Sequence, residues 1–380
     1  MSISDATRQR VWALSAGRCA ICNEYLLEGS VTHREIFLGE IAHIVGRKDS
    51  ERSPRGKSEL NAERRDSAAN LMLICADNHD EIDDKAVLDA ATVERLLALK
   101  RGHEARVKHV TGLGAGADSL VLRMIADVRG YAVELAQDAA AAAVFASGKF
   151  PHFPLAFDRH SIEIDLRSIP GEPDAGEAYY TSATAIIDDV IDGRLRDGVR
   201  RDAIPHMSVF AFGRIPLLVY LGSRLDDTVP TTIFQRHRSS ESWSWPSDPA
   251  ATANFGMSVR NEHPAAEAVL VLNISGTINT SELPERLVPL PRYTIDVVDA
   301  PATMDVIDSP VVLRRFELTT RHFLSHLEKA NKSVRRLHVL PALPLSAAVV
   351  LGRVGNPDVH PALLVYERVD NAYRPSIEVS

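Results

Sequence analysis

Three cysteines, the only ones in the chain of 380 residues, are spaced like ligands of a metal ion. Cys19-x-x-Cys22 has the spacing of a zinc knuckle, a tight turn that brings two thiolates to one ion, and Cys75 can supply a third thiolate. So few cysteines in this length argue against a disulfide scaffold and favour a metal site in a reducing cytosol. A structural zinc ion takes four ligands, so one more is needed. The candidates for the fourth ligand are Asn78, Asp77 and His33.

Two histidines and an asparagine near these cysteines could hydrolyse a phosphodiester. His43 lies in the apolar stretch "EIAHIV", Asn70 directly precedes "LMLIC", and His79 follows Cys75 closely. An imidazole can take a proton from the attacking water near pH 7, and a divalent cation can neutralise the charge that builds on the phosphate. By itself, His43 would more often be a buried histidine with a structural role. The order histidine, asparagine, histidine along the chain favours the catalytic interpretation.

The sequence also predicts the elements that would hold these residues. A helix is expected over residues 5–17, "DATRQRVWALSAG", with Asp5 as its N-cap and Gly17 as its stop. "EIFLGEIAHIV" is β-like, "LMLIC" is typical of a short buried strand, and "ATVERLLALKRGHEARV" has the periodicity of an amphipathic helix. The long polar segment between the two β-like stretches is of a length that is usually functional or disordered. Between Arg47 and Arg65 it holds seven Lys or Arg residues against four Asp or Glu residues, which fits either a solvated loop or a nucleic-acid contact.

Residues 1–110 resemble a zinc-stapled HNH endonuclease, a ββα-metal nuclease. The resemblance rests on "AHIVGR", "SPRG", "RDSAANLMLICADNHDEID" and "LLALKRGHE", which match such domains over most of this length. It implies that His43 is the general base, that His79 binds the catalytic cation (Mg²⁺ or another divalent ion), and that Asn70 holds the loop and orients His43. It also implies that a structural zinc ion fixes the strands and the helix around the site. The zinc ligands would include Cys19, Cys22 and Cys75.

One position departs from the family pattern. Many relatives have an acidic ligand of the catalytic metal directly before the base histidine, where this chain has Ala42. Glu40 or Asp83 could take that role. The basic segment Arg47–Arg65 would contact DNA phosphates, and each such contact should add about one unit of salt dependence. Glu104, in the "GHE" that is common in such domains, would support packing.

The composition bounds the class of protein. An apolar content of 45% and a charged content of 25% are those of a soluble globular protein, and the polar start "MSISDATRQRVW" has no signal pattern. No apolar run approaches the ~18 residues of a membrane span, so we expect a cytoplasmic protein without membrane contact. The net charge of −8 gives no general attraction to nucleic acid, so a nucleic-acid site would have to be local.

The glycine-rich "TGLGAGA", residues 111–117, predicts a domain boundary. We expect an endonuclease domain over residues 1–112, a linker helix over residues 113–150 and a second α/β domain over residues 151–380. The linker helix would begin near Asp118. Its apolar stripe fits either a coiled-coil-like seam between chains or packing on its own domain. The stripe consists of Val121, Ile125, Val128, Ala132, Leu135 and Ala139.

The C-terminal part contains an internal repeat. "MSVFAFGRIPLLVYLGSRL" at 207–225 is similar to "LHVLPALPLSAAVVLGRVG" at 337–355, and each is followed by a second β-rich run. We therefore expect two α/β halves, each in the order strand, helix, strand, although two unrelated βαβ units could look alike by chance. Two such halves offer a ligand cleft near the carboxyl ends of their strands. The aligned pairs are Val209 with Val339, Ile215 with Leu345, Leu221 with Leu351, and Gly222 with Gly352.

Residues 151–380 resemble a SAVED domain, a fused pair of CARF-like Rossmann modules that binds cyclic oligonucleotides. The resemblance rests on the repeat, on "FQRHRSSESWSW", "VLVLNISGTI" and "PALLVYERV", and on their order after an HNH-like domain. The whole architecture is similar to that of HNH–SAVED effectors of the CBASS antiphage systems, which signal with cyclic nucleotides.

Several residues of this part could bind such a ligand. Ser275, Gly276 and Thr277 follow an expected strand and precede an expected helix, where backbone N–H groups and hydroxyls could hold a phosphate. One indole of Trp243 and Trp245 could stack on a base, beside guanidinium groups that pair with phosphates, while the other packs inward. Both could also be core or interface residues. The remaining candidates are Arg236, Arg238, Pro344 and Ser346.

The sequence therefore predicts an α/β protein that acts as a cyclic-nucleotide-activated, metal-dependent DNA endonuclease. Its expected partners are a double-stranded DNA substrate, a cyclic di- or trinucleotide activator, and further copies of the chain, as a homodimer that forms a higher oligomer on activation. The alternative is a non-catalytic, zinc-stapled DNA-binding regulator with a nucleotide-sensing domain. Ala42 favours this alternative, whereas His43 together with His79 speaks against it.

Overall fold

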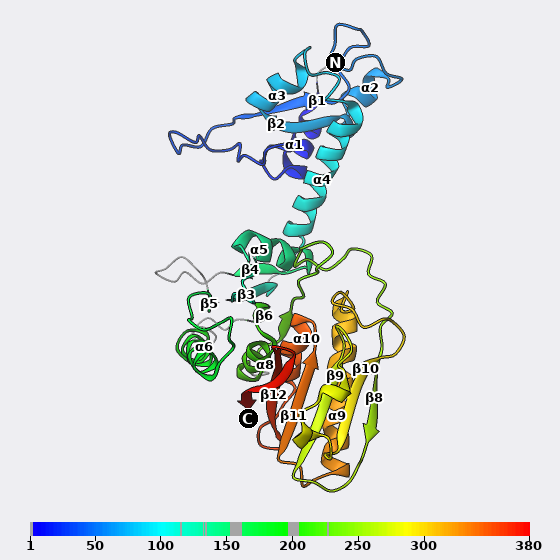
Figure 1. Ribbon diagram of the computed structural model, residues 1–380. Helices are drawn as coiled ribbons and strands as arrows, with labels where there is room; N and C mark the ends of the chain where they lie inside the picture. Colours follow the sequence, from blue (N-terminus) through cyan, green and yellow to red (C-terminus); the bar gives the residue numbers. More distant parts are fainter. Residues whose placement is uncertain are drawn as a thin grey trace. The chain divides into compact units, whose positions relative to one another are not determined.

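The computed structural model of the protein divides into two compact units, Met1–Gly114 and Ala115–Ser380 (Figure 1). The division falls within the glycine-rich segment "TGLGAGA". The residues that the structure describes are 3–114, 116–131, 133, 135–152, 162–196, 205–225 and 228–380. Among them, no helix has both the length and the apolar character that a membrane crossing requires.

The first unit begins with α1 (Asp5–Leu14). Its N-cap is Ser4 rather than the predicted Asp5, because the Ser4 hydroxyl accepts a hydrogen bond from the backbone N–H of Thr7 at 3.2 Å. Serine and aspartate both cap helices well, so the sequence does not decide between the neighbours Ser4 and Asp5. Asp5, in the first turn, still complements the helix dipole. Gly17 follows the helix with a φ of 68°, a conformation that glycine adopts easily after a helix end.

Two antiparallel strands and a helix form the centre of this unit. They are β1 (Gly39–His43), β2 (Leu71–Cys75) and α3 (Ala76–Asp83). His43 lies opposite Leu71 in the register, and all of β2 is buried, as the apolar "LMLIC" predicts. α3 starts directly after β2, so Cys75 is both the last residue of the strand and the N-cap of the helix.

The remaining elements of the first unit are α2 (Ala62–Arg65), the 3₁₀ helix η1 (Ala68–Asn70) and α4 (Val93–Thr111). α2 and η1 lie in the long polar segment between β1 and β2, which is therefore partly helical. α4 is the predicted amphipathic helix, and its buried His103 lies 3.2 Å through Nε2 from the carbonyl oxygen of Ser15, just after α1. Glu104 forms an ion pair with the buried Lys100, which fits the packing role expected for it.

The first sheet of the second unit is parallel throughout. Its order is β4-β3-β6-β7, with β5 also paired to β3. The strands are β3 (Asp118–Ile125), β4 (Phe150–His152), β5 (Ile162–Asp165), β6 (Met207–Phe212) and β7 (Thr231–Ile233). Its helices are α5 (Gln137–Ala146), α6 (Glu177–Val190), the π-helical η2 (Ile191–Leu195) and α8 (Ile215–Arg224).

The helix predicted to run from Asp118 is wrong at its start, because Asp118–Ile125 forms β3 in this sheet, whereas Gln137–Ala146 near its predicted end is helical, as α5. A strand that is covered on both faces is almost continuously apolar, so it also satisfies the spacings of a helical stripe. Val121 and Ile125 of the expected inter-chain seam are accordingly buried in the unit itself. Ala132 of that seam lies outside the described residues.

The second sheet has the order β13-β12-β11-β9-β10-β8. Its four central strands are parallel, and the two edge strands β8 and β13 run antiparallel to their neighbours. The strands are β8 (Phe255–Arg260), β9 (Glu267–Asn273), β10 (Arg292–Val297), β11 (Arg336–Ala342), β12 (Ala362–Val369) and β13 (Ala372–Val379). Its helices are α9 (Pro310–Ala330), α10 (Leu345–Arg353) and the 3₁₀ helices η3 (Thr280–Glu282) and η4 (Glu285–Leu287).

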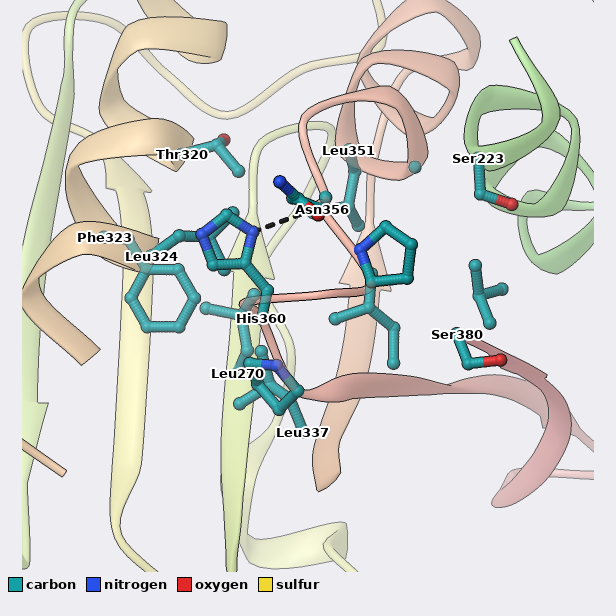
Figure 2. A pocket seen from close by; sticks show the side chains of 16 residues that line it. Ser223, Leu270, Thr320, Phe323, Leu324, Leu337, Leu351, Asn356, His360 and Ser380 are labelled. Carbon is teal, nitrogen blue, oxygen red and sulfur yellow. Dashed lines mark hydrogen bonds between the residues drawn. The ribbon is translucent and has the colours of Figure 1, made fainter. Parts of the chain in front are cut away.

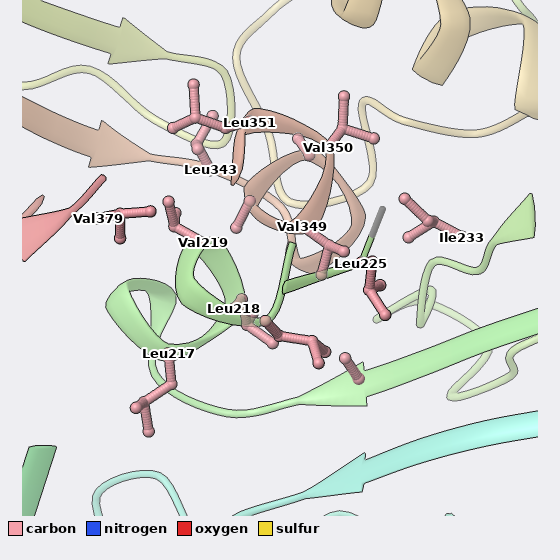
Figure 3. Packing of buried hydrophobic residues seen from close by; sticks show 14 of the residues in the cluster. Leu217, Leu218, Val219, Leu225, Ile233, Leu343, Val349, Val350, Leu351 and Val379 are labelled. Carbon is pink, nitrogen blue, oxygen red and sulfur yellow. The ribbon is translucent and has the colours of Figure 1, made fainter. Parts of the chain in front are cut away.

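The predicted repeat is confirmed. The segments β6–α8–β7 and β11–α10–β12 have the same order of elements, and the alignment of the two segments carries Ile215, the first residue of α8, onto Leu345, the first residue of α10. Apolar side chains of α8 and α10 pack against one another and against neighbouring strands (Figure 3). The side chains labelled there include Leu217, Leu218, Val219, Leu225, Val349, Val350 and Leu351.

Two glycines bring the repeated helices together. A Cβ on Gly222 of α8 would lie 2.0 Å from the carbonyl oxygen of Val349, and a Cβ on Gly352 of α10 would lie 1.9 Å from that of Val219. Val219 and Val349 are themselves equivalent positions of the two repeats, so the contact is reciprocal. Only glycine permits this approach of two backbones, which explains why both repeats have glycine here.

Candidate functional site

Three sulfur atoms gather at the start of α3. The Sγ atoms of Cys19, Cys22 and Cys75 all lie within 4.8 Å of one another, and those of Cys22 and Cys75 are 3.8 Å apart. A tetrahedral zinc ion with Zn–S bonds of ~2.3 Å holds its sulfurs ~3.8 Å apart. The three cysteines therefore fit a metal ion both in chemistry and in spacing.

The chain around Cys19 and Cys22 is a tight turn docked on β2. The backbone N–H of Asn23 donates to the Cys19 carbonyl at 2.9 Å, and Asn23 has a φ of 64°. The Ala20 N–H donates to the carbonyl of Leu73 at 2.8 Å. Because Leu73 and Cys75 belong to the same short strand, this hydrogen bond holds the turn next to the third sulfur.

Asn78 is the polar side chain that lies against these sulfurs. Its Nδ2 atom is 3.0 Å from Sγ of Cys75 and 3.3 Å from Sγ of Cys19. Of the other two candidate ligands, His33 has a side chain that is 78% exposed, and Asp77 is exposed in the first turn of α3. No carboxylate or imidazole in the described ranges joins the three sulfurs within 4.8 Å.

The surroundings act differently on two of the thiols. Burial acts to raise the pKa of Cys19, but hydrogen bonds from backbone N–H groups, first that of Cys22, outweigh burial and lower this pKa below its ordinary value. Burial raises the pKa of Cys75 to about 11. A bound cation would favour the thiolate at both positions, because the metal binds the deprotonated sulfur.

His43, at the end of β1, is paired with a carboxylate. Its Nε2 atom is 2.9 Å from Oδ1 of Asp66, and both side chains are largely buried. A carboxylate that accepts the hydrogen bond from one ring nitrogen fixes the orientation and the tautomer of the imidazole. His43 therefore has the partner that a proton acceptor needs.

His79, on α3, lies between two other carboxylates. Its Nδ1 atom is 2.5 Å from Oε2 of Glu40, and its Nε2 atom is 3.8 Å from Oδ2 of Asp83. Because side chains alternate along a strand, Glu40 and Ala42 lie on the same face of β1. Glu40 is thus the carboxylate next to His79, on the same face as position 42, where the resemblance to HNH endonucleases leads us to expect an acid. Glu40 and His79 could hold a divalent cation together.

Asn70 fixes the backbone just beyond His43. Its Oδ1 atom accepts a hydrogen bond from the Val45 N–H at 2.9 Å, and its Nδ2 atom donates to the carbonyls of Val45 at 2.8 Å and Arg65 at 2.9 Å. Asn70 is itself buried. The loop that follows β1 is therefore tied to the residue that precedes β2.

Two arginines of the basic segment bind inside the first unit. Arg55 donates to the carbonyls of Ile44 at 2.7 Å and Ile82 at 2.5 Å, and its Nη2 atom is 2.6 Å from Oδ1 of Asp83. The buried Arg65 donates through Nε to the Leu60 carbonyl at 2.8 Å. These two side chains are used in contacts within the unit. The exposed cations of the segment are Arg47, Lys48, Arg52, Lys57 and Arg64.

The sequence analysis did not predict the contacts of Asp66 and Arg55. Asp66 is 23 residues from its partner His43, and Arg55 is 28 residues from Asp83. Both lie in a charged segment, and nothing in the sequence distinguishes them from charged neighbours that face the solvent. The position of Asp66 four residues before Asn70, directly before an apolar strand, was the one available signal.

In the second unit, candidate residues lie at the carboxyl ends of parallel strands. Gln235 follows β7, and its Oε1 atom accepts hydrogen bonds from the backbone N–H of Ser346 at 3.0 Å and from its hydroxyl at 2.7 Å. Ser346 lies in the first turn of α10, which Pro344 caps, and both are buried. Ser346 and Pro344 thus join the two halves rather than line an open surface.

The two repeated helices begin differently. The alignment of the repeats carries Arg214, the residue before α8, onto Pro344. Arg214 is buried and forms ion pairs with Glu172, at 2.8 Å from its Nε atom, and with Glu367 of β12, at 2.5 Å from its Nη1 atom. The first helix thus starts in a buried charged cluster that also reaches the second half.

The two tryptophans after β7 differ in burial. Trp243 is only 2% exposed and meets Phe210 edge to face at a centroid distance of 5.6 Å, so it is the one that packs inward. Trp245 is partly exposed and lies 5.3 Å from the ring of His237. Arg238 is exposed, and its backbone N–H is held by Asp305 at 2.7 Å.

Four nitrogen atoms of this segment are buried and make no hydrogen bond to any described residue. Buried polar groups without a partner are costly, so they are rare in folded proteins. The atoms are Nε of Arg236, Nε2 of His237, and Nε1 of Trp243 and Trp245.

The predicted phosphate cradle at Ser275, Gly276 and Thr277 needs correction. The segment follows β9 as predicted, but it continues as bends and then η3 rather than as an α-helix. A short 3₁₀ turn further along the chain does not provide the aligned N–H groups of a helix start. The backbone of Ser275 is instead used within the sheet, where its N–H donates to the Ala342 carbonyl at 2.8 Å.

A cavity of about 60 Å³ lies elsewhere in the second unit (Figure 2). Leu270, Phe323 and Leu337 are among its apolar lining, and at one side the Asn356 N–H donates to Nδ1 of His360 at 3.0 Å. Its walls include the start of β11 and the end of α10, whereas ligands of such sheets bind at the carboxyl ends of the strands. Pockets for whole ligands measure about 300–1,000 Å³, so this cavity is too small for a cyclic nucleotide.

Residues 187–379, just over half of the chain, match the family described as the SMODS-associated and fused to various effectors sensor domain, SAVED. The chain belongs to the SAVED family. The match includes both repeated segments and the whole second sheet. None of the proteins with curated descriptions matches the chain.

The fold of the SAVED protein is distantly similar to that of solved receptors. A SAVED/CARF-domain containing receptor, Cap4 of Acinetobacter baumannii, solved with the cyclic trinucleotide 2'3'3'-cAAA, is 14% identical with a TM-score of 0.45, covering 78% of this chain and 61% of that one. The Cap4 receptor of Moraxella osloensis is 17% identical with a TM-score of 0.40, covering 57% and 46%. The matches thus span less than two thirds of either receptor.

Proposed function

We propose that this SAVED protein is a metal-dependent DNA endonuclease that a cyclic oligonucleotide activates. The observation that carries the proposal is the ββα arrangement of β1, β2 and α3. Within it His43 has a carboxylate partner, Asn70 holds the loop, and His79 lies beside Glu40. These arrangements are what hydrolysis of a phosphodiester needs: a base, a rigid support for it, and ligands for a cation.

In this proposal, His43 takes the proton of the attacking water. Asp66 accepts the hydrogen bond from Nε2–H, which leaves Nδ1 as the basic nitrogen and prevents the ring from turning. Asn70 holds Val45 and so fixes the end of the strand that carries His43. His79 and Glu40 would hold the divalent cation, which when bound neutralises charge on the phosphate.

The three cysteines would hold a structural zinc ion in the same unit. Because Cys75 both ends β2 and caps α3, fixing its sulfur also fixes the helix that carries His79. Cys75→Ser should therefore lower the zinc content and the melting temperature, since a structural zinc site contributes directly to folding. The same zinc content and melting temperature as in the unaltered protein would argue against this role.

The second unit would bind a cyclic di- or trinucleotide at the carboxyl ends of its strands. Two features support this site: the sensor family, and the partly exposed ring of Trp245. The indole would stack on a base, and the exposed Arg238 would pair with a phosphate.

Activation would proceed through assembly of several copies, so that paired endonuclease units cut both strands of DNA. A destructive nuclease has to be inactive without its signal. Moving an equilibrium from 1:99 to 99:1 requires about 5.5 kcal/mol of differential affinity, and ligand binding that also orders contacts between copies can supply it. The chain would act in the cytoplasm, as an effector of CBASS-type antiphage signalling.

A non-catalytic DNA-binding regulator is the second candidate. It is favoured by Ala42 and by the ion pair in which Arg55 holds Asp83 at 2.6 Å, because both leave fewer acids for a cation. The exposed cations of the basic segment would serve either function.

One experiment separates the two functions. The purified full-length chain and its His43→Ala variant are incubated with plasmid, Mg²⁺ and a panel of cyclic di- and trinucleotides. We expect one nucleotide to trigger cleavage, and His43→Ala to lower the rate by ~10²–10⁴ while binding that nucleotide equally well. Nucleotide-dependent DNA binding without cleavage by either protein would instead establish the regulator.

A further inference from the structure

We infer that the fourth ligand of the zinc centre is the side-chain carboxamide of Asn78, which binds the ion through its oxygen. The site is then Cys₃Asn, a set of three thiolates and one neutral oxygen. The inference rests on the structural zinc ion of the proposed function and names the ligand that the three cysteines leave open.

The distances from Asn78 to two of the sulfurs are close to those of a fourth ligand. The sulfurs of Cys22 and Cys75 are 3.8 Å apart, the edge length of a zinc tetrahedron with ~2.3 Å bonds. An oxygen ligand at ~2.0–2.2 Å from the same ion would lie ~3.5 Å from each sulfur. The amide end of Asn78 lies 3.0 Å from Sγ of Cys75 and 3.3 Å from Sγ of Cys19, so a few tenths of an ångström separate it from this position.

The helix start places the side chain there. Cys75 is the N-cap of α3, which makes Asn78 the third helical residue. A side chain at that position reaches back to the N-cap residue, as in a capping box. Its two amide atoms exchange places by a half-turn about the last bond, so the NH₂ group that now faces the thiols can be replaced by the oxygen when a cation is present.

The competing ligands do not fit. His33 is 78% exposed and its Nδ1 atom is 3.2 Å from Oε1 of Glu28. Asp77 is exposed, and no carboxylate of the described chain shares the 4.8 Å neighbourhood of the three sulfurs. Neither residue lies among the sulfurs, whereas Asn78 already contacts two of them and needs only a change of one torsion angle to present its oxygen.

A neutral oxygen in place of a fourth thiolate has a measurable consequence. Three thiolates and an amide leave the zinc complex with one negative charge, and the harder oxygen is a weaker ligand than sulfur for this ion. Asn78→Cys should therefore bind zinc more tightly than the unaltered chain. Asn78→Asp keeps an oxygen ligand and should retain the metal, whereas Asn78→Ala removes the ligand.

The test measures zinc and cobalt binding by the full-length chain, without any activity assay. Zinc affinity is taken from competition with a chromogenic chelator, and the number of thiolates from the sulfur-to-metal absorption of the Co²⁺-loaded protein. We expect Asn78→Ala to lose at least tenfold in zinc affinity, given that even residues behind a ligand contribute 10–100-fold. We expect Asn78→Asp to stay close to the unaltered chain. Asn78→Cys should raise the cobalt absorption by about a third, because it adds one thiolate to three.

Asp77→Ala and His33→Ala are the matched controls, and neither should change the affinity. If Asn78→Ala fails to fold, the cobalt spectrum of Asn78→Cys decides, since an unchanged absorption would overturn the inference. Equal zinc affinity of Asn78→Ala and the unaltered chain would overturn it as well. If Cys75→Ser loses the zinc ion but all Asn78 variants bind zinc equally well, the zinc centre stands and only the identification of its fourth ligand is wrong. If Cys75→Ser has no effect on metal content, the zinc centre itself is refuted.

Discussion

Gly222 of α8 and Gly352 of α10 each lie against a backbone carbonyl of the other helix, at equivalent positions of the two repeats. A methyl group at either glycine would come within about 2 Å of a carbonyl oxygen that its own helix holds in place. This close approach of the two helices therefore depends on the absence of two side chains.

Gly222→Ala or Gly352→Ala should lower the stability of the sensor domain by at least ~2 kcal/mol, because forcing an extra carbon into a packed contact displaces backbone. In a unit of this size that corresponds to a fall of ~4–8 °C in melting temperature, measured by calorimetry. Gly193→Ala is the control: its Cβ would meet nothing within 4 Å, and its melting temperature should stay near that of the unaltered chain. Equal melting temperatures for all three variants would contradict the close approach of α8 and α10 at these glycines.

Asp66→Asn should slow DNA cleavage by about 10–100-fold, the usual effect of losing the carboxylate behind a functional histidine. The amide oxygen can still accept from Nε2–H, but it carries no charge to stabilise the protonated ring, and the amide NH₂ group can favour the other tautomer instead. Melting temperature and zinc content should not change. Glu63→Gln, an exposed neighbour in α2, serves as the control. A normal rate for Asp66→Asn would show that His43 does not depend on this partner.

Replacing an exposed cation of the basic segment should reduce the salt dependence of DNA binding. Lys48→Gln, Arg52→Gln and Lys57→Gln should each lower the slope of log affinity against log salt by about 0.9 if the residue contacts a phosphate. Arg55→Gln should behave differently and destabilise the unit, because Arg55 binds two carbonyls and Asp83 internally. Slopes that none of the three exposed replacements changes would place the DNA elsewhere.

Trp243→Ala and Trp245→Ala should have different effects. Trp243 is buried against Phe210, so its loss should reduce stability by ~3–5 kcal/mol. Trp245 is partly exposed, so its loss should raise the nucleotide concentration needed for activation by ~5–150-fold, which corresponds to ~1–3 kcal/mol of stacking. Thermal melts and activation curves of the two variants measure both. An unaltered activation curve for Trp245→Ala would remove the stacking role.

His206, which directly precedes β6, should make the sensor domain less stable in mild acid. Its Nδ1 atom is 2.8 Å from the Ser119 hydroxyl and its Nε2 atom is 2.9 Å from that of Thr232. Burial, and then the charge of Lys149, lowers its pKa from 6.5 to about 4. Between these values the unfolded chain binds the proton and the folded chain does not, so stability is lost as the pH falls from about 6.5 towards 4, by about 3 kcal/mol at most.

Denaturant unfolding at pH 7, 5.5 and 4.5 measures this effect. His206→Gln keeps a hydrogen-bonding side chain without a titrating ring, so its stability should change less over the same range. The same pH dependence of stability in both proteins would show that His206 does not cause the loss.

The sequence predicts those parts of the fold that depend on local pattern. "LMLIC" forms the buried β2 and "ATVERLLALKRGHEARV" forms α4, because an apolar run and a 3.6-residue period are properties of the segment itself. The repeat could be recognised because both segments pack in the same way and therefore have similar apolar patterns and a glycine where their helices cross. β3 was mistaken for a helix because a strand covered on both faces has no alternation to reveal it.

The candidate site was harder to predict where it depends on distant partners. The residue types and order of Cys19, Cys22, Cys75 and Asn70 were sufficient to expect their placement. The pairing of His43 with Asp66, and the internal use of Arg55, result from how a long polar segment returns on itself. No spacing rule predicts such a return, because the segment has few apolar residues to fix its path.

The unequal starts of α8 and α10 make the duplicated domain asymmetric in charge. Both starts are buried, with Arg214 held by two carboxylates at one of them and Pro344 at the other, so neither side chain faces an open surface. The two halves are thus equivalent in packing at Gly222 and Gly352 but not in their electrostatics. If a cyclic molecule with identical nucleotides binds across both halves, as proposed, its two sides would lie in different surroundings and it would be held in one direction only.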